Sequence, residues 1–315
     1  MRILVLTNML PSSARPSRGV FVQEQIEDLR RLGLEVSVLV IDGSASRVNY
    51  LRSIPRVRAC LGAFPVDLVH AHYGLTGAVA VTQRRAPVVT TFHGSDCSGE
   101  IPWQKAVSWG VARTCTPIFV SNQLAVGIGC PGAAVIPAAV DLDVFHPVDK
   151  ALAREELGWP GDGEIALLPG SRSDPAKGAS LFDAALKRAR RTLPGLNGAS
   201  LEGLTREQVA LTMNAADVTV MTSRAEGSPV AIRESLACLT PVVSVPVGDV
   251  ERHVSGLPGC AVVPRDPDRI AHALPAAIAA GRSAALRERV TPFGRPATAT
   301  RVVKVYRSIL AGQDH

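Results

Sequence analysis

Glu226 and Glu234 are two carboxylates with seven residues between them, in the segment SRAEGSPVAIRESLAC. A carboxylate accepts two hydrogen bonds from a vicinal diol. One glutamate is therefore suited to the ribose of a nucleotide and the other to the hydroxyls of a transferred sugar. The same spacing also fits two solvated glutamates on a surface helix, so the interpretation depends on the groups around them.

A helix start is predicted between these two glutamates. Ser228 is a favourable N-cap and Pro229 a favourable first helical residue. The backbone N–H groups of Val230 and Ala231 would then be unpaired at the positive end of the helix dipole. Such a terminus favours a phosphate or a sugar hydroxyl oxygen.

A second constellation is the loop in LLPGSRSDPAKGASLF, where Arg172 and Lys177 are five residues apart. The loop follows an apolar run that reads as a strand, so we expect it at the carboxyl end of that strand, on the same rim as Glu226. Two fixed positive charges there would hold a diphosphate and stabilise its charge as it leaves. The alternative is an ordinary basic turn.

The first half of the chain carries a third constellation, VVTTFHGSD, in which His93, Gly94, Ser95 and Asp96 directly follow a strand. His93 is suited to bond sugar hydroxyls or a phosphate, although a lone histidine at a strand end is often structural. Earlier in the chain Gly19 precedes a helical pattern. It would leave room for a ligand to approach the backbone.

A basic cluster consists of Arg47, Arg52, Arg56 and Arg58, and no acidic residue occurs from residue 43 to 66. It predicts either a solvated helix face or a patch for an anionic acceptor or an acidic membrane surface.

The composition predicts a packed globular protein. The 315 residues are 46% hydrophobic and 20% charged, with a formal net charge of +6. This charge is mild and evenly spread, which argues against nucleic-acid binding. The six cysteines have no metal-ligand spacing and are expected to be buried free thiols: Cys60, Cys97, Cys115, Cys130, Cys238 and Cys260.

The N-terminal run MRILVLTNML is short and ends at Pro11, which is more typical of a first buried strand than of a signal peptide. No apolar run is long enough to span a bilayer. We therefore expect a cytoplasmic protein, with contact at the inner membrane face as the possibility that the basic cluster raises.

Short apolar runs alternate with amphipathic stretches in both halves of the chain. This rhythm predicts an α/β protein with two Rossmann-like, doubly wound domains whose strand ends line a cleft. We expect domains over 1–146 and 147–297, and a helix in 298–315 that crosses back to the first domain. No second strand is evident in the second domain, where PGLNGASLEG occupies its place, so that domain is expected to be shortened.

Together these segments resemble the family 4 retaining glycosyltransferases of the GT-B fold, in the family's order and over nearly the whole chain. The matching segments are Gly19, His93-Gly94-Ser95-Asp96, the Arg172 and Lys177 loop, and Glu226-Gly227-Ser228-Pro229 through Glu234. One departure is the interdomain link, where Ala138-Ala139 replaces the family's usual Asn-Gly pair before Val-Asp.

The resemblance implies roles for these residues. Arg172 and Lys177 would hold the donor diphosphate, Glu226 the transferred sugar and Glu234 the ribose, with His93 beside the sugar near the reacting centre. The remaining nucleotide-sugar contacts are expected from Gly19, Gly94, Asp96, Gly227, Ser228, Pro229, Val230 and Ala231. The resemblance also implies retention of anomeric configuration and no bound metal or cofactor, because the basic pair takes the metal's role. It names no side-chain nucleophile.

The expected reaction moves a sugar from a UDP- or GDP-linked donor to a glycan, a lipid-linked acceptor or a small molecule. Two alternatives remain at this point. One is a sugar-nucleotide-binding protein without transferase activity, suggested by the shortened second domain. The other is a different GT-B enzyme, such as a nucleotide-sugar epimerase or a phosphorylase.

Overall fold

The computed structural model describes residues 1–11, 18–43, 45–99 and 101–312. The chain forms two compact units, one of Met1–Ala139 with Arg295–His315 and one of Val140–Gly294. The C-terminal helix predicted in 298–315 is α13 (Arg295–Ala311), which belongs to the first unit; residues 313–315 lie outside the described part. The two units divide at Ala139, a few residues before the predicted boundary at 146.

The first unit is built on a sheet of six parallel strands in the order β2-β1-β3-β4-β5-β6. Its strands are β1 (Arg2–Thr7), β2 (Glu35–Val40), β3 (Leu68–His72), β4 (Val88–Phe92), β5 (Thr116–Phe119) and β6 (Ala134–Val135). The central strands β1 and β3 are buried along almost their whole length. This explains their continuous apolar runs, because helices cover both faces of a doubly wound sheet.

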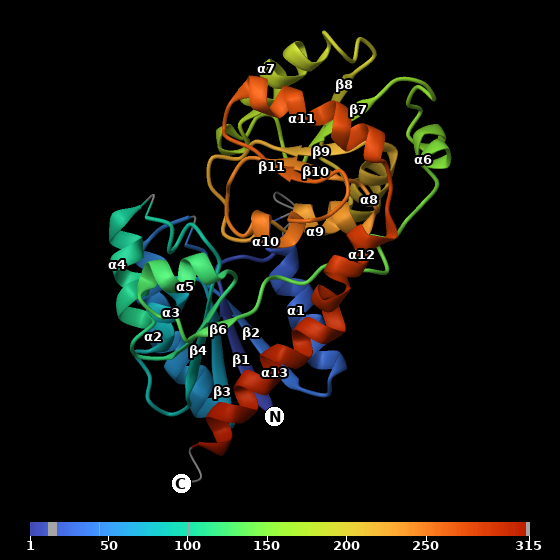
Figure 1. Ribbon diagram of the computed structural model, residues 1–315. Helices are drawn as coiled ribbons and strands as arrows, with labels where there is room; N and C mark the ends of the chain where they lie inside the picture. The colour runs from blue at the N-terminus through green and yellow to red at the C-terminus, as the bar shows by residue number, and fades with distance from the viewer. Residues whose placement is uncertain (12–17, 44, 100, 313–315) are drawn as a thin grey trace. The chain divides into compact units, whose positions relative to one another are not determined.

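The helices of the first unit are α1 (Val20–Arg31), α2 (Val48–Ala63), α3 (Gly74–Ala80), α4 (Pro102–Val111), α5 (Asn122–Ile128) and α13 (Figure 1). Gly19 begins α1 in the left-handed region, with φ 71°. A Cβ at this position would lie 2.5 Å from the carbonyl carbon and oxygen of Met9. Glycine is therefore required by local packing, whatever else approaches the helix start.

The second unit has a five-stranded parallel sheet in the order β11-β10-β9-β7-β8. Its strands are β7 (Ile165–Leu168), β8 (Asn197–Ser200), β9 (Val218–Met221), β10 (Val242–Ser244) and β11 (Ala261–Val262). Strand β8 lies within PGLNGASLEG, so the expectation that this sheet lacks its second strand was wrong. β8 is an exposed edge strand, half-buried at best, and therefore shows no apolar run.

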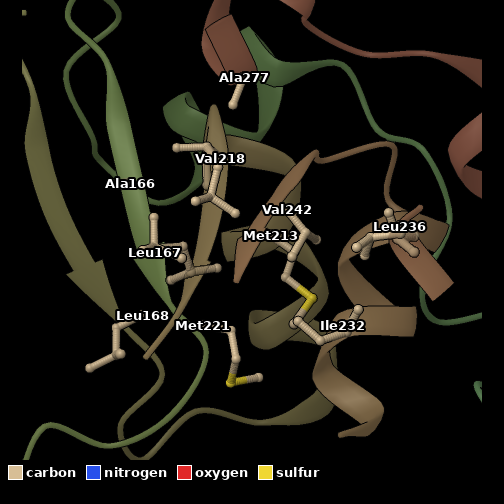
Figure 2. Packing of buried hydrophobic residues seen from close by; sticks show 14 of the residues in the cluster. Ala166, Leu167, Leu168, Met213, Val218, Met221, Ile232, Leu236, Val242 and Ala277 are labelled. Carbon is tan, nitrogen blue, oxygen red and sulfur yellow. The ribbon is translucent and has the colours of Figure 1, made fainter. Parts of the chain in front are cut away.

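Helices cover the second sheet and close its core. They are α6 (Lys150–Glu156), α7 (Ala179–Ala189), α8 (Arg206–Ala215), α9 (Val230–Ala237), α10 (Val250–Val254), α11 (Pro267–Ala280) and α12 (Ala284–Val290), with short 3-10 turns η1 (Pro175–Lys177) and η2 (Thr291–Phe293). Figure 2 shows Leu167 and Val218 of the strands packed in one cluster with Met213, Ile232 and Leu236 of the helices. This packing holds the carboxyl ends of β7 and β9 next to the start of α9.

All six cysteines are free thiols, as expected. Cys97 and Cys238 are buried and the other four are half-buried. Burial raises the pKa of the Cys115 thiol to about 11 and that of Cys238 to about 12. The shifts keep both thiols protonated and unreactive.

Candidate functional site

The loop that carries Lys177 is joined to the loop after β9 by backbone contacts. Thr222 donates its hydroxyl to the Lys177 carbonyl at 2.9 Å, and the Arg224 N–H donates to the Ala176 carbonyl at 2.8 Å. Gly178 follows with φ 70°, and a Cβ there would lie 2.2 Å from the Thr222 carbonyl oxygen. Only glycine allows the two loops to approach this closely.

Lys177 and Glu226 meet at the junction of these two loops. The Lys177 ammonium nitrogen donates to Glu226 Oε1 at 2.8 Å, and the two side chains are 29% and 18% exposed. Each charge is thus compensated by the other while one edge of the pair still faces solvent. A bound sugar nucleotide would provide the same compensation. Its diphosphate would be the anion for the lysine, and a sugar hydroxyl would be the hydrogen-bond donor for the glutamate.

Arg172 is not part of this ion pair. Its guanidinium binds both carboxylate oxygens of Asp183, at 2.6 and 2.5 Å, and lies over the ring of Phe182. The pair is exposed, so the arrangement is held only weakly. The structure therefore brings Lys177, and not Arg172, to Glu226.

The start of α9 differs from the predicted one. The helix begins at Val230 with Pro229 in the N-cap position, and no side chain caps it. The expectation of Ser228 as N-cap was wrong because its hydroxyl is engaged elsewhere. It donates to Asp249 at 2.9 Å and accepts from Arg233 at 2.8 Å.

The two charged partners of Ser228 form a buried network with His253. Burial alone would raise the pKa of Asp249, but its hydrogen bond to His253 and the nearby charge of Arg233 hold that pKa below its usual value. Charged partners make stronger hydrogen bonds than a helix backbone N–H does. This network fixes the Gly227-Ser228 loop and leaves the first-turn N–H groups of Val230 and Ala231 without an N-cap side chain.

Glu234 is buried, only 5% exposed, and accepts from Arg206 at 2.5 Å. Arg206 opens α8, which is started by a capping box of Thr205 and Gln208, and lies over the ring of Phe145. Arg206 is not among the site residues predicted from the sequence. The T-x-x-Q spacing of a capping box, visible in the sequence, would have placed it at a helix start.

In the first unit, Asp96 organises the loop after β4. It is buried, and its carboxylate accepts from the backbone N–H groups of Gly74 at 3.0 Å, His93 at 3.1 Å and Gly94 at 2.9 Å. Burial raises the pKa of Asp96, and these backbone hydrogen bonds oppose that shift. Asp96 therefore holds the loop, while Ser95 is exposed and bonds the hydroxyl of Tyr73 at 3.0 Å.

His93 lies at the carboxyl end of β4 within a row of three histidines. Its Nε2 is 3.1 Å from Nδ1 of His72, and the two rings stack 5.3 Å apart. His70 comes next and bonds the Tyr306 hydroxyl and Thr91. Burial lowers the pKa of His93 and of His70 to about 3 and lowers that of His72 as well. All three rings are neutral at physiological pH and act as hydrogen-bonding groups.

His70 and His72 are not among the site residues predicted from the sequence, although the spacing HAH at the end of an apolar strand is a signal for them. Residues two apart in a strand point to the same face, so both rings come to the side of the sheet that α13 covers with Tyr306.

The basic cluster lies on α2 of the first unit. Arg47 stacks over the Trp103 ring of α4 at 4.9 Å, Arg52 and Arg56 are exposed, and Arg58 donates to the Thr82 carbonyl. Beside them α2, α3 and α4 enclose an apolar pocket of about 430 Å³.

The described residues contain neither a metal-ligand cluster nor a membrane-spanning helix. No three His, Cys, Asp or Glu side chains in them are grouped as metal ligands would be. None of their helices combines the length and the apolar character needed to cross a bilayer.

Two sequence families match the chain. Residues 5–116 match the glycosyl transferase 4-like domain, and residues 175–279 match the glycosyl transferases group 1 family. The two matches fall in the first and second units respectively, and the second includes Lys177, Glu226 and Glu234.

Individual relatives agree with these families. D-inositol 3-phosphate glycosyltransferase 1 of Catenulispora acidiphila is 29% identical over 78% of this chain and 73% of its own. Sucrose-phosphate synthase of Thermosynechococcus elongatus superposes with a TM-score of 0.82 at 20% identity, covering 99% of this chain and 100% of its own. HepE of Anabaena, solved with UDP-glucose, gives 0.72 at 17% identity, covering 98% and 100%.

Proposed function

The chain belongs to the group 1, family 4-type glycosyltransferases with the GT-B fold, and we propose that it transfers a sugar from a nucleoside diphosphate donor with retention of configuration and without a bound metal. The ion pair of Lys177 and Glu226 carries this proposal. The lysine ammonium is a cation for the diphosphate, and the glutamate carboxylate is a hydrogen-bond acceptor for the sugar hydroxyls. Both lie at the carboxyl ends of adjacent strands, where open α/β sheets bind ligands.

A uridine diphosphate donor has support from outside the chain, since HepE was solved with UDP and with UDP-glucose. GDP-linked donors remain in the proposal. The acceptor is a glycan, a lipid-linked sugar or a small molecule. The names of the D-inositol 3-phosphate glycosyltransferases favour a small anionic acceptor among these.

Three groups of the second unit would act on the donor: Lys177 on the diphosphate, Glu226 on the transferred sugar and Glu234 on the ribose. In the first unit, neutral His93 would bond a sugar hydroxyl. Arg172 joins Lys177 only if it leaves Asp183. We therefore expect Lys177 to contribute more to donor binding and leaving-group stabilisation than Arg172 does.

The test is nucleotide release from UDP- and GDP-sugars with candidate acceptors, followed by NMR of the anomeric product. Lys177→Ala and Glu226→Ala should each lower turnover by about a hundredfold or more, because each removes a preorganised charge at the developing diphosphate or sugar. Arg172→Ala should lower it less. Exposed Lys187 and Glu155 provide matched alanine controls in the same unit. Full turnover in both site variants would refute the assignment, inversion would refute retention, and loss on chelation would refute metal independence.

Strand β8 removes the ground for a protein without transferase activity, because that alternative rested on a missing second strand. An epimerase or phosphorylase would be recognised in the same assay, by sugar isomerisation or by phosphate dependence without an added acceptor.

The α2 surface of the first unit suits an anionic lipid bilayer. Leu51 is 68% exposed and Trp103 40%, and both line the apolar pocket. Val48, 49% exposed, lies on the same helix as the exposed Arg52 and Arg56. Exposed apolar side chains among arginines are typical of an interfacial helix, where the apolar groups enter the bilayer and the arginines meet lipid phosphates. If the acceptor is lipid-linked, this surface is where we expect the enzyme to meet it.

Pelleting with vesicles of phosphatidylglycerol and phosphatidylcholine tests this surface. Arg52→Gln with Arg56→Gln should reduce pelleting in low salt, and Leu51→Ser should reduce it at every salt concentration. A double variant of exposed Arg84 and Lys304 to Gln removes equal charge elsewhere on the unit. Equal pelleting by all variants would show that α2 is an ordinary solvated face.

A further inference from the structure

The proposed function leaves one buried group unused, the imidazole of His72 at the end of β3. The ring is 1% exposed. Its Nδ1 meets Nε2 of His93 at 3.1 Å. Its own Nε2, on the other side of the ring, is buried and has no hydrogen-bond partner among the described residues. Buried polar atoms are almost always paired, so this nitrogen indicates a ligand.

Gln25 of α1 supplies a complementary atom. Its Oε1 is also buried and without a partner among the described residues. Both side chains line one cavity of about 20 Å³, together with Thr91 and the ion-paired Asp28 and Arg295. A cavity needs at least about 10–15 Å³ and two or more polar partners to hold a water molecule. This one has room for one water and nothing larger.

We propose that this cavity binds a single water molecule that links His72 to Gln25, and that His72 is a positioning residue which fixes the tautomer of His93. The chain of hydrogen bonds runs from His93 Nε2–H to His72 Nδ1, from His72 Nε2–H to the water, and from the water to Gln25 Oε1. Each ring N–H in this chain has an acceptor, and one O–H of the water is directed at an amide oxygen that only accepts. The carboxylate of Asp28, which lines the same cavity, accepts the second O–H, so the water has no proton left for His72 Nε2 and accepts from it instead.

The tautomer matters because His93 is neutral and carries a single ring proton. With that proton on Nε2 and directed at His72, Nδ1 of His93 presents a lone pair and accepts from a hydroxyl of the bound sugar. With the opposite tautomer it would have to donate. The water therefore decides which hydrogen bond His93 makes to the substrate. This consequence rests on the proposed function, whereas the water site and the tautomer do not.

The tautomer is read directly by nitrogen-15 NMR of the histidine rings in the ligand-free protein. We expect both His72 and His93 to carry the proton on Nε2. In Gln25→Leu the His72 signal should shift toward the other tautomer or a mixture, because the amide acceptor is lost. Gln23→Leu, an exposed glutamine on the same helix, should leave it unchanged. A proton on Nδ1 of His72 in the native protein, or no change in Gln25→Leu, would overturn the proposal.

Kinetics then test the positioning role. His72→Asn keeps an amide near Nδ1 and should retain most activity, whereas His72→Leu should lower kcat about 30-fold with little change in the donor KM. In His93→Ala the further change His72→Leu should have no additional effect, because the two residues act as a unit. Additive losses would refute the role. If no variant or native protein turns over any sugar nucleotide, the proposed function fails while the NMR result still decides the water site.

Discussion

The two units of the chain present chemically different groups at the carboxyl edges of their sheets. In the first unit these are the neutral rings of His72 and His93, with His70 behind them, and no hydrogen bond joins these rings to a carboxylate among the described residues. The carboxylate at this edge, Asp96, accepts from backbone N–H groups. In the second they are two ion pairs, Lys177 with Glu226 and Arg206 with Glu234. Both sheets are parallel and doubly wound, so the fold does not explain the contrast.

Charge explains it. A nucleoside diphosphate carries charge that must be matched by a cation, and a cation in a half-buried site needs an anion when the ligand is absent. A sugar offers only hydroxyls, which neutral rings can bind without any change of charge. On the proposed function, charge recognition would fall to the second unit and hydroxyl recognition to the first.

The largest expected effect that tests this comparison is the response to acid. Burial lowers the folded-state pKa of the three histidines below their unfolded value of about 6.5, so the unfolded state binds more protons below that pH, down to about 3 for His70 and His93. The free energy of unfolding should therefore fall as pH drops below about 6.5, by up to about 1.4 kcal/mol per pH unit for each histidine. Buried His253 of the second unit adds to the effect.

Urea unfolding at a series of pH values measures this stability. In a Trp159→Phe variant the fluorescence comes from Trp103 and Trp109, both in the first unit, so the signal reports that unit alone. A first unit as stable at pH 5 as at pH 7 would contradict the assignment of neutral rings.

The next effect concerns the backbone junction under the first ion pair. Gly178→Ala should destabilise the second unit by about 3 kcal/mol, because a left-handed residue gains a Cβ that overlaps the Thr222 carbonyl. UDP binding should weaken with it as Lys177 moves. Gly203→Ala, at φ 67° with open space around it, should cost only about 1 kcal/mol by thermal unfolding. Equal losses in the two variants would show that the junction is not strained.

The smallest effect concerns the second ion pair. Arg206→Ala leaves the buried carboxylate of Glu234 without its ion-pair partner. Because this carboxylate is then no longer held in place to accept hydrogen bonds from the ribose, donor affinity measured by calorimetry should fall about tenfold. Arg188→Ala breaks the more exposed pair with Asp268 and should change donor affinity less than twofold. A donor affinity unaffected by Arg206→Ala would remove Glu234 from the proposed ribose site.

Much of the fold follows from local pattern. Strand β1 and helix α1, which Gly33 follows, are readable because apolar periodicity and turn residues act over a few positions. Strand β8 could not be predicted because it lacks such a local pattern. Its Asn-Gly-Ala-Ser sequence has no apolar alternation, and it is a strand only because β7 pairs with it.

The candidate site also has features that local sequence predicts and features that only tertiary contacts decide. The sequence by itself determined which residues stand at strand ends and helix starts, including His93, Lys177 and Glu226, because motif spacing and turn chemistry are local. Only the tertiary structure decided partners far apart in the chain. Lys177 pairs with Glu226, Arg172 pairs with Asp183, and the hydroxyl of Ser228 donates to Asp249. Such partners depend on which side chains the packed elements bring within reach of one another, and packing is a property of the folded chain that no short stretch of sequence contains.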